Sequence, residues 1–238
     1  MADGTLERIP TDPANPYPLG RAGIWHDPRN RQFRALAEAA PLLPERDRRW
    51  VSPPVFDQGQ TSSCAFQSAI GVLSTTPNRV AFKPFKDRYD DEAEREAGYL
   101  RAQLLDPFPG QEPESQGTST DAPFQVLRQE GIISGWKWLF GFDEMKQFVM
   151  YNGPVSVGTN WYQSMFTPDS RGFLSIDGQV AGGHCWRVVG YSTYQKAFRM
   201  VNSWGRSWGD FGRGWVKDDV MRRLLEEQGE VVTPTTSA

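Results

Sequence analysis

The chain has 238 residues, enough to bury a sizeable core as one large domain or as two lobes around a cleft. Its hydrophobic share of 38% and its charged share of 23% are typical of a soluble globular protein. The formal net charge of −3 gives no overall basic field, so we expect neither nucleic acid nor an anionic membrane as a partner.

The two cysteines cannot form the disulfide framework of a small secreted scaffold. The first thirty residues contain no apolar segment of a secretory signal, and no apolar run approaches the roughly 18 residues of a membrane span. We therefore expect a cytoplasmic protein. A protein released by lysis or associated with a phage or another particle would show the same features.

The first part of the chain predicts little regular structure. Residues 1–20 are rich in Pro, Asp and Asn, which is typical of an irregular or extended arm. Apolar residues recur at helical spacing over residues 31–40 and predict a short helix. Prolines at positions 41, 44, 53 and 54 then favour an extended segment.

The rest of the chain places helices before strands. Helical patterns cover residues 64–76, 90–105, 122–133 and 143–153. Short segments rich in Val, Phe, Trp and Tyr predict strands over residues 154–159, 172–176, 184–192, 197–204 and 212–218. Residues 229–238 resemble a loose C-terminal tail. This order predicts an α+β protein with a helical lobe that faces a sheet lobe.

The sequence gives little support for a metal site or a phosphate-binding loop. The only histidines, His26 and His184, show no paired ligand spacing with Cys64 or Cys185, as a zinc site would need. The chain has no Gly-rich phosphate loop of the G-x-x-x-x-G-K-[ST] kind. We therefore expect no metal and no cofactor.

Nucleophilic catalysis by a thiolate fits the residues better. Cys64 opens an apolar helix, and the N-terminus of a helix lowers the pKa of a thiol. His184 stands at the head of a predicted strand and Asn202 near the end of the next one, so antiparallel pairing would let the amide hold the imidazole. Gln58 precedes the cysteine closely enough to donate a side-chain N–H to a developing oxyanion, together with the backbone N–H of Cys64.

Three segments, in this order along the chain, resemble the papain-like cysteine peptidase family. PVFDQGQTSSCAF resembles the nucleophile segment of that family, GGHCWRVVGY its histidine segment and VNSWGRSWGDFGRGWV its asparagine segment. Weaker similarity in GTSTDAPFQVLRQEGI and PVSVGTNWY extends the match over residues 48–220. The general character of the sequence is similar to a bacterial or phage branch of the family.

The resemblance implies roles for individual residues. Cys64 would be the nucleophile, His184 the base, Asn202 the group that orients His184, and Gln58 the oxyanion donor. The implied substrate-binding positions are Gly117, Thr118, Gly158, Thr159, Gly183 and Trp204. The implied protein is a two-lobed papain-like peptidase with a peptide or protein substrate. Its domain would cover residues 48–228, between an arm at 1–47 and the tail at 229–238.

Some features depart from the family pattern. Ala65 follows the nucleophile where most members have Trp, and Thr61 replaces a cysteine that normally forms a disulfide. We expect Cys185 to be buried and inert and to face away from the cleft, because strand side chains alternate between faces. Residues 1–47 show no inhibitory prosegment motif of the family, although such an arm could still cover the cleft.

Two other functions fit the same sequence. A transglutaminase-like acyl transferase would use the same three residues with an amine as acceptor. A binding module would keep the fold without turnover, or would be blocked by its own N-terminal arm.

Overall fold

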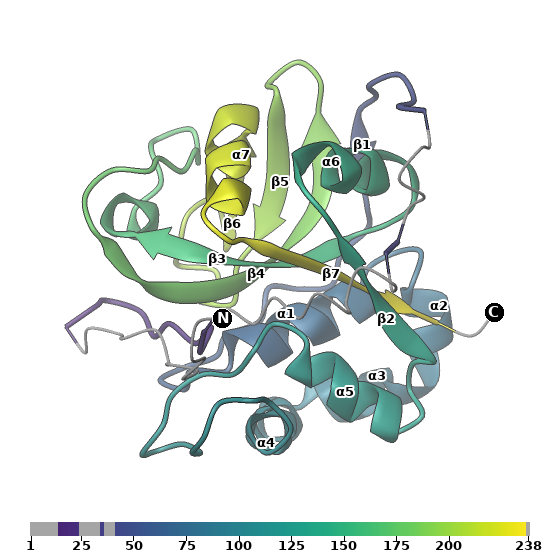
Figure 1. Ribbon diagram of the computed structural model, residues 1–238, viewed down its shortest axis with the longest axis vertical. Helices are drawn as coiled ribbons and strands as arrows, with labels where there is room; N and C mark the ends of the chain where they lie inside the picture. The colour runs from purple at the N-terminus through teal and green to yellow at the C-terminus, as the bar shows by residue number, and fades with distance from the viewer. Residues whose placement is uncertain (1–13, 24–33, 36–40, 237–238) are drawn as a thin grey trace, which may run out of the picture.

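The computed structural model describes residues 14–23, 34–35 and 41–236, and Figure 1 shows their arrangement. His26 and most of the helix predicted over residues 31–40 lie outside these ranges. A helical lobe forms first along the chain. It contains α1 (Cys64–Leu73), α2 (Arg79–Phe82), α3 (Lys86–Asp90), α4 (Glu92–Gln103) and α5 (Ala122–Gln129), with a 3-10 turn at Lys83–Phe85.

An open antiparallel sheet of seven strands forms the second lobe. Its strands are β1 (Arg48–Arg49), β2 (Gly135–Leu139), β3 (Val155–Tyr162), β4 (Val180–Ser192), β5 (Ala197–Val201), β6 (Arg213–Lys217) and β7 (Glu230–Thr235). Their order is β2-β7-β3-β4-β5-β6, and β1 pairs with β4 outside this path. Two more helices, α6 (Phe142–Tyr151) and α7 (Asp218–Glu226), lie on the side of the sheet opposite α1 (Figure 1). The predicted α+β class is confirmed.

Helix α1 lies between the two lobes. All ten of its residues are buried, because it packs on β3 and β4 on one side and on α4 and α5 on the other. Gly98 of α4 allows this close packing, since a Cβ atom there would lie 2.1 Å from the ring of Phe66. Ser63 occupies the N-cap position, but its side chain makes no capping hydrogen bond. The first N–H groups of the helix therefore remain oriented towards the space in front of Cys64.

Each lobe has its own hydrophobic core. The core of the helical lobe includes Phe66, Tyr99 and Phe124, and the core of the sheet lobe includes Trp161, Trp186 and Phe198. A small third cluster of buried residues joins the lobes and consists of Cys64, Ala65 and Cys185. The cysteine predicted as nucleophile therefore lies where the two lobes meet.

The structure of the C-terminal segment differs from the loose tail that the sequence predicted. Residues 230–235, which we expected in a loose tail over 229–238, form β7 between β2 and β3. Val231 and Val232 are buried in the sheet, and Glu230 is buried as well. The alternation of apolar and polar residues in this segment is too short to predict a strand, and burial by both neighbouring strands decides its conformation.

Sequence reasoning also missed β2 and α7. The strand expected over 172–176 is reduced to a single bridge between Phe173 and Trp215.

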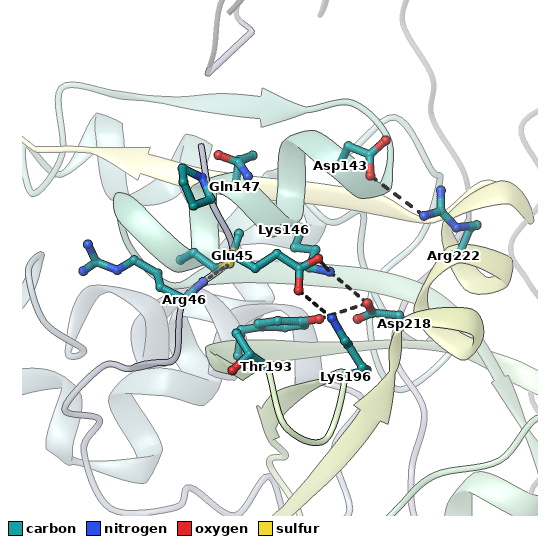
Figure 2. A network of polar contacts seen from close by, with 12 residues as sticks. Glu45, Arg46, Asp143, Lys146, Gln147, Thr193, Lys196, Asp218 and Arg222 are labelled. Atoms are coloured by element: carbon teal, nitrogen blue, oxygen red, sulfur yellow. Dashed lines mark hydrogen bonds and ion pairs between the residues drawn. The ribbon is translucent and has the colours of Figure 1, made fainter. Parts of the chain in front are cut away.

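The segment before β1 is fastened to the sheet lobe by charged groups (Figure 2). Glu45 accepts hydrogen bonds from Lys146 at 2.6 Å and from Lys196 at 2.9 Å. Lys146 also donates to Asp218 at 2.9 Å, and Asp47 accepts from the backbone of Thr193 at 2.7 Å. These contacts link residues 45–47 to α6, to α7 and to the turn between β4 and β5, although the sequence placed them in the arm.

Candidate active site

Cys64 is the first residue of α1, and its side chain is fully buried. Its Sγ atom accepts a hydrogen bond from the backbone N–H of Cys185 on β4 at 3.3 Å. The helix end and this N–H both place positive partial charge at the sulfur, which favours the thiolate over the thiol.

His184 and Asn202 come from the neighbouring antiparallel strands β4 and β5, as the sequence predicted. His184 lies on β4, and Asn202 directly follows the last residue of β5. His184 Nε2 and Asn202 Oδ1 are 2.8 Å apart. The other ring nitrogen, Nδ1, has no hydrogen-bond partner among the residues that the structure describes. That nitrogen remains available for the thiol and for a substrate.

Two indole rings enclose the imidazole of His184. Trp204 stacks on it with 4.4 Å between ring centroids and 27° between the planes, and Trp161 meets it edge-on at 4.8 Å. Both indoles are buried, so they keep water away from the hydrogen bond between His184 and Asn202. Trp161 was missed as a site residue. The segment PVSVGTNWY contains it, but only the register of β3 beside β4 brings its ring to His184.

Cys185 is buried as predicted, but its side chain lies next to Cys64 rather than facing away from it. α1 packs against the face of β4 that carries Cys185, as shown by Arg187 on the same face, whose side chain lies against Gly71 of α1. The alternation of side chains therefore brings Cys185 to Cys64 while His184 points from the opposite face. Both thiols are free.

The pKa values of the two thiols diverge. Burial alone would raise the pKa of Cys64, because a buried thiolate loses its hydration. The hydrogen bond between the two cysteine side chains and the positive charge of a protonated His184 outweigh burial and lower the pKa of Cys64 well below its usual value. Burial and the neighbouring Cys64 raise the pKa of Cys185 well above its usual value. The arrangement therefore keeps the thiolate on Cys64 and the proton on Cys185.

Gln58 lies beside these residues and is held by several hydrogen bonds. Its Oε1 atom accepts from the hydroxyl of Ser203 at 2.7 Å, which fixes the side-chain amide group in one orientation. Its Nε2 atom donates to the carbonyl oxygen of Thr61 at 2.7 Å and to that of Pro18 at 3.3 Å. One N–H of this amide therefore points at a carbonyl group of the N-terminal arm.

The arm over residues 14–23 lies across these residues (purple in Figure 1). The backbone N–H groups of Gly20 and Arg21 both donate to the carbonyl oxygen of Gly183, at 3.1 and 2.9 Å. Gly20 and Ala22 also exchange backbone hydrogen bonds with Thr118, each of 3.0 Å. The arm is thus bound by backbone groups immediately before His184 and at the segment that the sequence assigned to substrate binding.

Residues 17 and 18 of the arm contact Trp204. The ring of Tyr17 stacks on Trp204 at 4.7 Å with 9° between the planes, and Trp204 Nε1 donates to Pro18 O at 3.1 Å. Gly20 is pressed against the nucleophile segment, since a Cβ atom there would lie 1.9 Å from the carbonyl oxygen of Ser62. Gly117 faces Gly20 just as closely, because its own Cβ atom would lie 2.5 Å from Gly20 O.

Gly158 and Thr159, the remaining predicted substrate-binding residues, differ in what they contact. Gly158 on β3 faces the side chain of Arg21, whose Cδ would lie 3.0 Å from a Cβ atom at this glycine. Thr159 is buried, and its hydroxyl accepts a hydrogen bond from the indole of Trp186 at 3.2 Å, so it supports the sheet. Arg21 itself, Tyr17 and Glu230 were not predicted, because no sequence pattern indicated where the arm would lie or that β7 would form.

No group of three or more His, Cys, Asp or Glu side chains in the described part of the chain is placed to hold a metal ion. In the same part, no helix is long and apolar enough to cross a membrane. A buried cysteine with a lowered pKa, next to a histidine that an amide orients, is an arrangement suited to nucleophilic attack.

Comparison with known proteins agrees with this fold and geometry. Residues 95–229, more than half of the chain, match the model of the papain family cysteine protease. Cysteine proteinase 3 of Entamoeba histolytica is 25% identical over 197 residues, which cover 75% of this chain and 63% of that protein. Cathepsin B of Dictyostelium discoideum is 29% identical over 98 residues, which cover 36% of this chain and 32% of that one. The chain spans less than two thirds of the length of these curated relatives.

Among solved structures, the crystal structure of xylellain, a cysteine protease from Xylella fastidiosa, matches with a TM-score of 0.68 at 17% identity, and the match covers 100% of both chains. Digestive procathepsin L 3 of Tenebrio molitor larval midgut matches with a TM-score of 0.56 at 17% identity, over 85% of this chain and 73% of that one. The fold is therefore papain-like. The chain belongs to the papain family of cysteine proteases.

Proposed function

We propose that the protein hydrolyses peptide bonds of peptide or protein substrates with Cys64 as the nucleophile, His184 as its acid and base, and Asn202 as the group that orients His184. One observation carries this proposal. The pKa of Cys64 is lowered beside His184, whose Nε2 lies 2.8 Å from Asn202 Oδ1 while its Nδ1 has no partner among the described residues. A group activated in this way attacks a carbonyl carbon readily at neutral pH.

The first half of the reaction follows from these positions. The Cys64 thiolate forms a bond to the carbonyl carbon of the substrate, and the electron pair of the C=O bond moves to the oxygen. The N–H groups of Gln58 and of the Cys64 backbone stabilise the resulting oxyanion. When the C–N bond breaks, His184 gives the proton on Nδ1 to the leaving amine, and an acyl-enzyme remains.

The second half uses the same groups with water. His184, now neutral, takes a proton from a water molecule that attacks the acyl carbon. The C–S bond then breaks, the acid product leaves, and the thiolate of Cys64 is restored next to a protonated His184. Asn202 accepts the Nε2–H hydrogen bond throughout and keeps Nδ1 directed at the sulfur.

The test is labelling with iodoacetamide and with an epoxysuccinyl probe near pH 6, read by intact mass, together with hydrolysis of casein. We expect single labelling of the wild type and of Cys185→Ser, no rapid labelling of Cys64→Ala, and casein cleavage that Cys64→Ala loses. Rapid labelling of Cys64→Ala through Cys185, or casein cleavage that survives in it, would contradict the proposed nucleophile.

We also propose that the arm over residues 14–23 holds the enzyme in a closed state. The support is the position of its contacts, at Gly183, Thr118, Trp204 and Gln58, which are four of the residues assigned to substrate binding or catalysis. A peptide substrate needs the same backbone groups, so the arm and the substrate compete. The sequence left open that the N-terminal arm covers the cleft, as one form of the binding-module alternative.

The two free cysteines support the proposal that the protein works in a reducing compartment such as the cytoplasm. That it belongs to a bacterial or phage branch of the family remains a prediction.

A further inference from the structure

Three arginines line a small pocket on the sheet lobe. Arg49 lies on β1, Arg199 on β5 and Arg213 on β6, and the pocket has a volume of about 270 Å³. The other residues that line it are neutral, namely Trp50, Val51, Ser52 and Val189. Among the described residues that line this pocket, none is acidic, and none is a proposed catalytic or substrate-binding residue.

The sheet register brings the three arginines together. Arg49 pairs with Gly190 of β4, and Gly190 pairs in turn with Arg199, so the two arginines flank a residue without a side chain. Arg199 pairs with Trp215 of β6, and Arg213 lies two residues before Trp215, so it shares that face of the sheet. The guanidinium of Arg199 lies 5.2 Å from the centroid of the Trp215 ring. Paired strands therefore fix the backbone positions of all three arginines.

These positive charges have no carboxylate bound to them. Among the described residues, the side chains of Arg49 and Arg199 form neither an ion pair nor a hydrogen bond, and that of Arg213 donates only to Phe211 O at 3.0 Å. Burial, followed by the charges of Arg49 and Arg213, lowers the pKa of Arg199, and the more weakly acting Asp210 opposes this effect. The arginines repel one another, and an anion between them would relieve that repulsion.

A fourth arginine adds positive charge near Arg213. Arg187 on β4 is buried, and its Nε atom has no hydrogen-bond partner among the described residues. Its Nη2 atom donates to Pro54 O at the long distance of 3.4 Å. Burial and the charge of Arg213 lower the pKa of Arg187 to about 9, so Arg187 is still charged at neutral pH. The positive potential at the pocket is therefore larger than its lining residues alone would give.

We propose that this pocket binds a dianionic phosphate group, either as free phosphate or as the phosphate monoester of a larger molecule. A planar guanidinium can donate two parallel N–H groups to an oxyanion, which suits arginine to phosphate. Three guanidinium groups match a doubly charged group better than a single carboxylate. Sites for whole drug-sized ligands have about 300–1,000 Å³, so a pocket of about 270 Å³ fits one phosphate group with a short attachment.

The test is isothermal titration calorimetry of the full chain at constant ionic strength and about pH 8, where the phosphate group is dianionic. One titration uses inorganic phosphate, and the other uses N-acetyl-phosphoserine amide. We expect saturable binding of one phosphate group per chain, with Kd raised at least about tenfold in Arg49→Gln and in Arg199→Gln. Arg128→Gln is the matched control, because Arg128 is exposed on α5 in the other lobe, and its Kd should equal that of the wild type.

The two ligands distinguish the source of the phosphate group. Tighter binding of the phosphoserine compound would indicate a monoester, and equal or weaker binding would indicate free phosphate. Saturable binding of neither ligand, or the same loss of affinity in Arg128→Gln as in Arg49→Gln, would overturn the proposal.

Two further measurements keep the result free of folding and of the proposed chemistry. Arg49 is exposed, and its replacement removes repulsion, so Arg49→Gln without phosphate should melt no lower than the wild type. Cys64→Ala should bind phosphate as the wild type does, because Cys64 does not line the pocket. Phosphate binding in a protein that cleaves no casein would therefore support the pocket and count against the peptidase. Casein cleavage without phosphate binding would do the reverse.

Discussion

The imidazole of His184 is fixed on three sides, by the amide of Asn202 and by the rings of Trp204 and Trp161. Asn202 Oδ1 also accepts the backbone N–H of Ser203 at 2.8 Å, so the amide itself is held in place. These contacts therefore restrict the orientation of the imidazole ring of His184. Such fixed geometry is worth a large part of the rate in an enzyme, because the reacting groups need no reorientation.

Asn202→Ala removes the partner of His184 Nε2 and leaves Cys64, the proposed nucleophile, unchanged. We expect kcat for peptide hydrolysis to fall on the order of 100-fold, because the ring is no longer held towards Cys64. Asn202→Gln should recover part of the loss. The measurement is steady-state hydrolysis, and circular dichroism of each variant verifies the fold. An unchanged kcat in Asn202→Ala would show that the two indoles suffice to orient the ring.

The pH dependence of Cys64 follows from its lowered pKa. An ordinary thiol has a pKa of about 8.5 and loses reactivity as the pH falls below it. Because the pKa of Cys64 is well below the usual value, the thiolate persists as the pH falls, and the rate of iodoacetamide labelling should change little between pH 8 and pH 6. His184→Ala removes one of the causes, so its labelling should be slow at pH 6 and recover above pH 8. Identical pH profiles for the two proteins would contradict the role of His184.

At the scale of elements, β7 shows how a short segment completes the sheet. It pairs with β2 over five residues, from Gly135↔Thr235 to Leu139↔Val231, and with β3 at Ser156, Val157 and Gly158. Val232 is fully buried and packs in the core of the helical lobe with Trp138. β7 therefore connects both cores and also carries Glu230 into the site.

Val232→Ala should lower the free energy of unfolding by about 2 kcal/mol, from the loss of buried apolar surface and the cavity that remains. Val180→Ala is the matched control, because Val180 lies on β4 with 45% of its surface exposed, and we expect a change within about 0.5 kcal/mol. Urea unfolding followed by tryptophan fluorescence measures both. If Val232→Ala were as stable as the control, residues 230–235 would behave as the loose tail that the sequence suggested.

At the scale of the whole molecule, the described chain before β1 is attached to the sheet lobe at more than one place. Arg34 Nε lies 2.6 Å from Glu144 Oε2, and the backbone N–H of Ala35 donates to Trp138 O at 2.8 Å. Residues 45–47 are tied to the sheet lobe by Glu45 and Asp47, as Figure 2 shows for Glu45, while residues 17–22 occupy the site between the lobes. Residues 17–22 can therefore leave the cleft while residues 34–35 and the chain from residue 45 onward stay attached. Because the arm and the site belong to the same chain, the competition between the arm and a substrate does not depend on protein concentration.

Gly20→Ala tests the closed state. The added Cβ atom would lie 1.9 Å from the backbone carbonyl oxygen of Ser62, so the arm must move out of its seat. We expect faster labelling of Cys64 and faster peptide hydrolysis, by about tenfold for each 1.4 kcal/mol of arm binding that is lost. Pro16→Ala, at an exposed position of the same arm, is the control and should leave both rates unchanged. Equal rates in Gly20→Ala and the wild type would show that the arm does not restrict the site.

The sequence by itself determined the α+β class and the residues that meet at the site. Cys64 could be placed because the start of an apolar helix is encoded locally, and His184 and Asn202 because neighbouring strands along the chain tend to pair. Their hydrogen bond follows from that pairing.

Only the tertiary structure decided the rest. The strand β7, the contact of Cys185 with Cys64, and the Arg21–Glu230 pair all join segments far apart in the chain. Residues 230–235 become a strand because β2 and β3 provide hydrogen-bond partners on both sides, which no local pattern predicts. Arg21 and Glu230 are separated by almost the whole sequence, and their meeting depends on how the arm, the helical lobe and the sheet pack together.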